Sequence, residues 1–403
     1  MRIVVAHNYY GDYAVGGESV VFEQEVDYLR AAGCEVETLT HANIELARAG
    51  LSARLTAPLR FRSSSQIYEE ATTLLRRFRP EILHVHNYKY VLTPSIFQAA
   101  RDLGVRTVLT LHNYRLAAPC GQLRNGAQAC ERCVGNSALR SLWRQGCASS
   151  LRGRFLQTTF YYATRNLIVE KTDSFIALSE FGKSVFVRAG LPEERIFVKP
   201  NLAPDPVANG SSLSSSSGEP YAIFVGRLSK EKGAEFLADA WRDMETPLLV
   251  VGDGPLLSRL RANAPSNVVF LGARSRIETL DLLRNARLLV FPSLWYEGDP
   301  MAIVEASSLG VPILATRLGA RAEDIAKYRS GDLFNVGARE DFITSARRIL
   351  TNTEYRAELS LGARAMYEAL NEPSKNIESA LEIYRKTLEF ESATDRGRAK
   401  CRS

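Results

Sequence analysis

The sequence predicts an α/β protein with two doubly wound, Rossmann-like domains. Strand-like apolar runs alternate with helical patterns through most of the 403 residues, which is typical of parallel sheets joined by helical crossovers. Runs such as 222–225 and 288–291 are apolar throughout, as strands buried on both faces are. A Gly/Ser-rich stretch over 209–218 interrupts the pattern and divides the chain in its middle.

The individual elements follow from this alternation. Strands are expected at 2–7, 35–39, 81–86, 106–111, 174–178, 195–199, 221–225, 247–251, 267–271, 287–291 and 312–316. Helices are expected at 18–32, 66–78, 233–243, 354–370 and 376–392.

The domain organisation follows from the break. We expect an N-terminal domain over 1–205 that carries a cysteine-bearing insert at 115–150, and a linker over 206–219. A second domain is expected over 220–375, followed by a C-terminal helix and basic tail over 376–403. Ligands of open α/β sheets bind beyond the C-terminal strand ends, so the two halves are expected to face one another across a cleft.

Composition and charge limit the class of protein. With 45% apolar and 24% charged residues, the chain is neither disordered nor collagen-like. It has no apolar run of membrane-spanning length and no signal-peptide core, which predicts a cytoplasmic protein. The net charge of +6 is confined to the first half, and 106–154 holds eight arginines and one acid. That stretch is either a solvated surface or a patch facing an anion such as membrane headgroups, a lipid pyrophosphate or a nucleotide. Nucleic-acid motifs are absent from the sequence, so no nucleic-acid partner is expected.

Four cysteines cluster in the insert with the spacing C-x9-C-x2-C-x13-C. They are Cys120, Cys130, Cys133 and Cys147. Four thiolates can hold a tetrahedral structural zinc, although the first gap is longer than usual zinc-site spacings. Ordinary thiols and a redox pair are the alternatives. A catalytic zinc is not expected, since four thiolates leave no open position.

The segment 291–313 offers two carboxylates at the end of a buried strand. Glu297 follows the strand, and Glu305 lies about one turn inside the next helix, which is expected to start near Met301. Pro300 suits the first helical position. Two carboxylates here can bind vicinal hydroxyls of a sugar and a ribose, while the loop presents backbone N–H groups and a positive helix end. The bland alternative for Glu305 is a solvated helix residue, but its apolar neighbours indicate a buried one.

Two further loops follow strands in the second half. In 225–233, Arg227 and Lys232 can straddle a diphosphate, although two basic residues in a loop are by themselves weak evidence. The run Gly252-Asp253-Gly254 lacks the third glycine of a dinucleotide fingerprint, and we interpret it as a tight strand-to-helix turn.

Glycines and histidines mark the first half. Gly16-Gly17 lie before a helix and permit close backbone approach by an anion. His112 ends a strand, where it can exchange hydrogen bonds with a reacting sugar hydroxyl; a structural role is the common alternative. His84 and His86 share one strand face, without a third ligand nearby in sequence. The chain contains no D-x-D, so basic groups and helix ends are expected to neutralise leaving phosphates without a catalytic metal.

Together these residues resemble the retaining family-4 glycosyltransferases of the GT-B fold, of the bacterial surface-polysaccharide type. Glu297-x7-Glu305 is similar to the family's E-x7-E signature, and Gly226-Arg227-Leu228 with Lys232-Gly233 to its G-R-L-x-x-x-K-G motif. Further matches run in the expected order along nearly the whole chain: Gly16-Gly17, Lys199-Pro200-Asn201, 251–255, Phe270-Leu271-Gly272 and Ala306 to Pro312. His112-Asn113-Tyr114-Arg115 with the cysteine insert resembles the bacterial subgroup.

The resemblance implies roles for these residues. A nucleotide-diphosphate sugar would bind mainly to the second domain. Glu305 would hold its ribose, and Arg227 and Lys232, helped by Gly16 and Gly17, its diphosphate. Glu297 and the backbone of Gly298, Asp299 and Met301 would hold the donor sugar near His112, and Gly272 begins the loop expected at the base.

The resemblance also implies the partners. The acceptor would be a saccharide or a polyprenyl-linked saccharide. The protein could then be peripheral at the inner face of the membrane, using its basic N-terminal domain. The C-terminal helix would cross back to the N-terminal domain.

Three positions depart from the family pattern. The loop after the first glutamate is Glu297-Gly298-Asp299-Pro300 where the family has E-G-F-G, so Asp299 adds a negative charge and Pro300 removes an N–H. Arg287 stands where the family has aspartate, and Gly319-Ala320-Arg321-Ala322-Glu323 stands where the family has Gly-Gly-x-x-Glu. Two other functions stay open: a non-catalytic sugar-nucleotide-binding protein of this fold, and another activity on it, such as a sugar-nucleotide epimerase.

Overall fold

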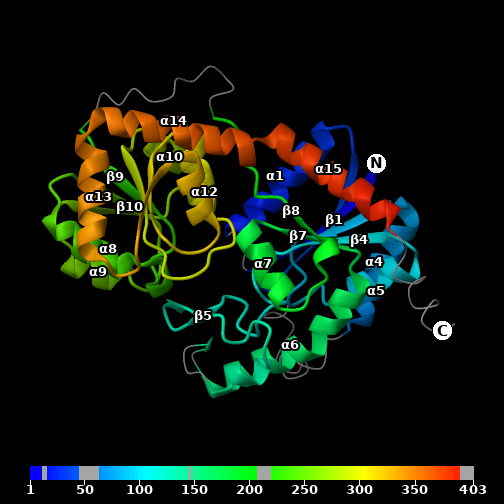
Figure 1. Cartoon of the computed structure of the whole chain (residues 1–403). Helices are drawn as coiled ribbons and strands as arrows, with labels where there is room; N and C mark the ends of the chain where they lie inside the picture. The colour runs from blue at the N-terminus through cyan, green and yellow to red at the C-terminus, as the bar shows by residue number, and fades with distance from the viewer. Residues whose placement is uncertain (11–15, 45–62, 144–146, 149, 207–218, 391–403) are drawn as a thin grey trace. The chain divides into compact units, whose positions relative to one another are not determined.

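A computed structural model describes residues 1–10, 16–44, 63–143, 147–148, 150–206 and 219–390. The Gly/Ser-rich stretch and the basic tail lie outside these ranges. The described chain forms two compact units (Figure 1). Unit 1 combines Met1–Gln122, Glu131–Pro200 and the C-terminal segment from Ser374, whereas unit 2 combines Leu123–Cys130 with Asn201–Pro373.

Unit 1 is built on a parallel sheet with the order β2-β1-β3-β4-β7-β8. Its strands are β1 (Arg2–Tyr9), β2 (Glu35–Ala42), β3 (Ile82–Val85), β4 (Arg106–Thr110), β7 (Ser174–Ala177) and β8 (Ile196–Val198). The chain changes direction in the sheet between β1 and β3, so the loops after these strands diverge. Such a switch point is where doubly wound folds bind ligands.

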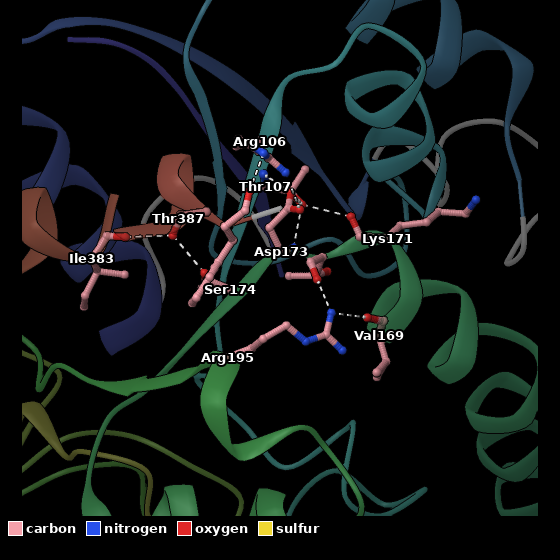
Figure 2. A network of polar contacts seen from close by, with 11 residues as sticks. Arg106, Thr107, Val169, Lys171, Asp173, Ser174, Arg195, Ile383 and Thr387 are labelled. Carbon is pink, nitrogen blue, oxygen red and sulfur yellow. Dashed lines mark hydrogen bonds and ion pairs between the residues drawn. The ribbon is translucent and has the colours of Figure 1, made fainter. Parts of the chain in front are cut away.

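The helices of unit 1 include the last helix among the described residues. They are α1 (Gly17–Ala31), α4 (Ser65–Phe78), α5 (Ser95–Asp102), α6 (Leu151–Lys171), α7 (Glu180–Arg188) and α15 (Pro373–Glu389), with short 3-10 turns η1 (Ala138–Ser141) and η3 (Glu193–Arg195). Figure 2 shows how α15 meets the sheet: the hydroxyls of Thr387 in α15 and Ser174 in β7 lie 2.8 Å apart. In the same view, Asp173, just before β7, accepts a hydrogen bond from the Thr107 amide of β4 at 2.9 Å.

Unit 2 contains a second parallel sheet with the order β11-β10-β9-β12-β13-β14. Its strands are β9 (Ala222–Val225), β10 (Leu248–Val251), β11 (Val268–Gly272), β12 (Leu288–Phe291), β13 (Ile313–Thr316) and β14 (Gly331–Phe334). In sequence terms this is the 3-2-1-4-5-6 order of a dinucleotide-binding sheet. Its switch point lies between β9 and β12, which are paired through Ala222 and Leu288.

Helices enclose this second sheet on both faces. They are α8 (Ala234–Ala240), α9 (Leu257–Asn263), α10 (Arg276–Arg284), α11 (Met301–Ser308), α12 (Ala320–Tyr328), α13 (Arg339–Thr351) and α14 (Thr353–Leu370), with 3-10 turns η4 (Lys230–Lys232) and η5 (Trp241–Asp243). Phe224 belongs to one buried cluster with Trp241 and Phe342, and its neighbour Ile223 to the other with Ile303. Alternate residues of one strand thus enter two cores, which explains why the strand is apolar throughout.

The predicted α/β class with two Rossmann-like sheets is confirmed. All eleven expected strands form, with ends shifted by no more than a few residues. The expected helix over 233–243 divides into α8 and η5. A short hairpin, β5 (Arg124–Asn125) with β6 (Gln128–Ala129), lies in the cysteine-bearing segment and groups with unit 2. Among the described residues, no helix is both long enough and apolar enough to cross a bilayer.

Candidate functional site

The switch point of unit 2 brings two expected loops together. Gly226 and Arg227 follow β9, and the loop that leads to Glu297 follows β12. The Leu294 amide donates to the Glu231 carbonyl at 2.8 Å, which joins the two loops directly. Gly233 has a φ of +73°, and a Cβ there would lie 2.0 Å from the Pro292 carbonyl oxygen. Only glycine permits this close approach, so the motif glycine serves loop packing.

Lys232 and Glu297 form the centre of this site. Lys232 Nζ lies 2.5 Å from Glu297 Oε1, which also accepts from the Ser293 hydroxyl at 3.0 Å and the Trp295 indole N–H at 2.7 Å. Both ionic side chains are largely buried, with exposed fractions of 22% and 14%. The residue expected at the diphosphate and the residue expected at the sugar therefore form one ion pair. Arg227, by contrast, is exposed.

Glu305 lies in α11 and faces a cation that the sequence analysis missed. Its carboxylate lies 3.3 Å from Arg276 Nε, at the start of α10. Burial raises the pKa of Glu305, and Arg276 opposes that rise. Arg276 directly follows the 272–275 loop that contains Gly272. No sequence signal separates it from the many other arginines of unit 2.

The loop between Glu297 and Glu305 is fixed by polar contacts from residues outside the loop. Asp299 is buried and accepts from Arg321 Nε at 2.6 Å and from the Asn201 amide at 2.7 Å. Asp299 departs from the family pattern, and its partner Arg321 lies next to Ala320, which departs from it as well. Gly298 is half-buried, and Met301 is the first residue of α11, whose N-cap is Pro300. Donor contacts by Gly298, Asp299 and Met301 stay predictions.

In unit 1, the expected His112 belongs to a row of histidines. It follows β4, and its Nε2 lies 2.9 Å from His86 Nδ1. The His84 and His86 rings are 4.4 Å apart, and His7 stacks on Phe22. Burial, with cationic neighbours, lowers the pKa of His112 well below its ordinary value. His112 is therefore neutral near pH 7 and can donate or accept a hydrogen bond, but its role at a sugar stays a prediction.

A third potential metal ligand joins His84 and His86, contrary to the expectation from sequence. Glu25 in α1 offers a carboxylate oxygen within 4.8 Å of the two imidazoles. Lys199 Nζ already lies 3.0 Å from that carboxylate. His84 contacts Tyr384 through Nδ1 and Thr110 through Nε2, both at 2.7 Å, so neither nitrogen is open to a cation. This cluster fits an internal ion-pair network better than a metal centre.

The glycine loop of unit 1 leads into a cluster of polar side chains. Gly16 caps α1 with a φ of +132°, and Gly17 is its first residue. Burial raises the pKa of the following Glu18 to about 7, with Arg115 opposing. Arg115 in turn contacts the Tyr10 hydroxyl at 2.5 Å. Glu18 and Arg115 therefore lie where the expected Gly16-Gly17 anion site begins.

Two family models match the chain. The model described as Glycosyl transferase 4-like domain matches residues 16–202, and that of Glycosyl transferases group 1 matches residues 210–366. With both halves matched, the chain belongs to the glycosyltransferases that combine a 4-like domain with a group 1 domain.

Known relatives and structures agree with that assignment. An uncharacterized glycosyltransferase of Methanocaldococcus jannaschii is 26% identical over 244 residues, which cover 56% of this chain and 65% of that protein. O-antigen chain mannosyltransferase C of Escherichia coli is 25% identical over 181 residues, covering 43% and 49%. The matched segments span less than two thirds of either relative. The structure of Anabaena HepE in complex with UDP has a TM-score of 0.64 at 17% identity and covers 96% of this chain and 100% of that one, which supports the GT-B fold.

The cysteine-bearing segment of the chain is divided between the units. Cys120, Cys133 and Cys147 belong to unit 1, and Cys130 to unit 2. Cys147 is buried and the other three are half-buried. A zinc or thiol cluster stays a prediction.

Proposed function

We propose that the protein is a retaining glycosyltransferase that moves a sugar from a nucleotide-diphosphate donor to a saccharide or polyprenyl-linked saccharide. The observation that carries the proposal is the arrangement at the β9–β12 switch point, where Lys232, Glu297 and Glu305 follow adjacent strands. A diphosphate needs cations and amides, and ribose and sugar hydroxyls need acceptors. This switch point offers both kinds of group together.

The proposed roles follow the chemistry of each group. Lys232 and the more exposed Arg227 hold the diphosphate, and Glu305 accepts hydrogen bonds from the ribose hydroxyls. Glu297, oriented by Ser293 and Trp295, faces the donor sugar. As the bond from the anomeric carbon to the phosphate oxygen breaks, the acceptor oxygen bonds to the same face of that carbon. The acceptor's proton passes to the leaving phosphate, whose charge Lys232 and loop amides stabilise.

The donor can be chosen by experiment. The Anabaena structure holds UDP, and another relative, from Corynebacterium glutamicum, is a GDP-mannose-dependent alpha-mannosyltransferase, so uridine and guanosine donors are both candidates. Thermal-shift screening with UDP, GDP and ADP identifies the base. Hydrolysis of the matching nucleotide sugars then identifies the sugar. Binding of a nucleotide without release of it from any nucleotide sugar would favour the non-catalytic alternative.

Retention and metal independence need separate tests. Proton NMR of the transfer product should show, at the new glycosidic bond, the anomeric configuration of the donor. Transfer should persist in excess chelator, because side chains and amides carry the charge of the leaving group in this proposal. An inverted product, or turnover lost with chelator and restored by magnesium, would refute it.

The surface-polysaccharide role extends the proposal to the cell. The O-antigen relative and the resemblance of the His112 segment support an acceptor in bacterial envelope synthesis, at the inner face of the membrane. For the four insert cysteines we propose a structural zinc, with ordinary thiols as the alternative outcome. Elemental analysis of the purified full chain, compared with a variant in which Cys130 and Cys133 are serine, distinguishes the two.

A further inference from the structure

Unit 1 carries a surface whose large apolar side chains point outward. Six of the twelve exposed large hydrophobic residues among the described residues lie between 139 and 162. They are Leu139, Trp143, Leu151, Phe155, Leu156 and Tyr162. We call this set, with the exposed Arg140 and Arg152, the α6 face.

The α6 face follows from apolar residues on the outer side of α6. Leu151 and Phe155, 65% and 63% exposed, lie on the outer side of the first turns of α6. Tyr162, eleven residues after Leu151, returns to the same stripe after three turns. The inward side of α6 buries Phe160 and Ile168 together with Thr158 and Thr164. The helix therefore has large apolar side chains on its outer side as well, which is unusual for a helix surface that faces only water.

The η1 segment belongs to the same surface. The Ser141 and Thr158 hydroxyls lie 2.7 Å apart, and Arg154 donates to the Leu142 carbonyl at 3.0 Å, so η1 is fixed against α6. This places Trp143, 86% exposed, on a segment attached to the helix. The apolar side chains of η1 and α6 thus form one supported patch.

The positive charge around the α6 face indicates an anionic partner. Between Glu131 and Glu170 the sequence holds six arginines and no acid. Arg140 and Arg152 are exposed within the apolar patch itself. Apolar and aromatic side chains flanked by arginine suit the boundary between headgroups and acyl chains of an anionic bilayer. A second copy of this chain would place arginines against arginines.

We propose that the α6 face docks the protein on an anionic lipid surface, with Trp143, Leu151 and Phe155 inserted among the headgroups. The inference deepens the proposed function, because a polyprenyl-linked acceptor would lie in that bilayer. Lipid binding does not require turnover, so the two can be tested apart.

Vesicle flotation of the full chain tests the proposal. The protein should float with vesicles of phosphatidylcholine and phosphatidylglycerol, less with phosphatidylcholine alone, and less as salt rises. Trp143 fluorescence should shift to shorter wavelength on binding, and this shift should be absent in Trp143→Phe. No flotation with the anionic vesicles, or equal flotation with both kinds, would overturn the proposal.

Matched variants locate the surface. Leu151→Ser with Phe155→Ser should weaken vesicle binding at least about tenfold, which corresponds to about 1.4 kcal/mol. Arg140→Gln with Arg152→Gln should reduce the preference for the anionic lipid. Leu361→Ser, at an equally exposed leucine of α14, is the control and should bind as wild type. Unchanged binding by both double variants would show that the surface is wrong.

Two readouts keep this inference apart from the proposed function. Nucleotide binding should be unchanged in the α6-face variants, and so should their thermal unfolding. Vesicle binding without any transfer activity would refute only the proposed function. A concentration-dependent dimer in sedimentation, dispersed by Leu151→Ser with Phe155→Ser, would replace the lipid by a second copy of the chain and overturn the proposal.

Discussion

Lys232 Nζ and Glu297 Oε1 lie 2.5 Å apart across the two loops that follow β9 and β12. This contact joins the group expected at the leaving phosphate to the group expected at the sugar. The contact, together with the Ser293 hydroxyl, fixes the Glu297 carboxylate in the loop after β12.

Lys232→Gln is predicted to weaken nucleotide-diphosphate binding by about tenfold or more, because a charge-assisted hydrogen bond is lost. The corresponding nucleoside should bind as weakly to the variant as to wild type. Titration calorimetry with both ligands measures the difference. Lys230→Gln, on the exposed side of η4, is the matched control. If the variant loses as much affinity for the nucleoside as for the nucleotide, Lys232 does not bind the diphosphate.

Glu305→Ala is predicted to lower donor affinity by at least about tenfold, or about 1.4 kcal/mol, through loss of hydrogen bonds from ribose hydroxyls. The same nucleotide without its 2′- and 3′-hydroxyls should bind wild type and variant equally. Glu340→Ala, at an exposed carboxylate of α13, serves as the control. If the variant binds the complete nucleotide normally, the ribose role is excluded.

The Asp299–Arg321 pair is predicted to be strongly coupled, because both side chains are buried and removal of one leaves the other charge unpaired. Breaking such a pair costs about 3–5 kcal/mol. A double-mutant cycle with Asp299→Ala and Arg321→Ala, followed by urea unfolding, should give a coupling above about 1 kcal/mol. The exposed Arg329–Glu358 pair, with atoms 2.9 Å apart, is the reference and should give less. Additive effects at 299 and 321 would contradict the ion pair.

The buried histidines predict a loss of stability in mild acid. Burial lowers the pKa of His7 to about 4, and burial likewise lowers the pKa of His84 to about 4. Between pH 6.5 and 4 the unfolded chain takes up protons that the folded chain excludes. The contribution of these histidines to the free energy of unfolding is therefore complete above pH 6.5 and falls as pH decreases to 4. His7→Gln should remove up to about 3 kcal/mol of that fall. Urea unfolding between pH 4 and 6.5 measures this dependence. If His7→Gln leaves the change of unfolding free energy with pH as it is in wild type, His7 is not a source of the acid sensitivity.

Glu18 predicts the opposite dependence. Since burial raises its pKa to about 7, the folded chain retains a proton that the unfolded chain releases from about pH 4.5. Its contribution is complete below pH 4.5 and is lost as pH rises to 7. Glu18→Gln, which keeps the shape without the charge, should raise stability at pH 8 relative to wild type and have little effect at pH 4. A variant that is less stable at pH 8 would show that the Glu18 charge is well paired with Arg115.

Much of the fold could be predicted because the signal is local. The apolar strands of unit 2 are recognisable because they are buried on both faces. The Gly252-Asp253-Gly254 turn is recognisable because only glycine fits there: a Cβ at Gly252 would lie 2.0 Å from the Gly226 carbonyl oxygen. The strand β14 was missed because Gly331-Asp332-Leu333-Phe334 is short and half polar.

Long-range partners could not be predicted from spacing. Glu305 was identified by its apolar neighbours, but nothing marks Arg276 as the arginine that meets it. Asp299 is a departure from the family pattern, but nothing in the sequence marks Arg321 as the arginine that pairs with it. Glu25 meets Lys199 across 174 positions of the chain. Such pairs depend on how the sheets bring distant loops together, and one sequence carries no record of that.

Lys199 also has a consequence for how the protein is made. Its ammonium bonds Glu25 near the start of the chain and Asn376 near the end, each at 3.0 Å. During synthesis, the N-terminal unit therefore lacks one of its own helices until Pro373–Glu389 has been translated. A chain released early, before α15, would leave Glu25, His84 and Lys199 without the cover they need, and is expected to be a substrate for chaperones and proteases.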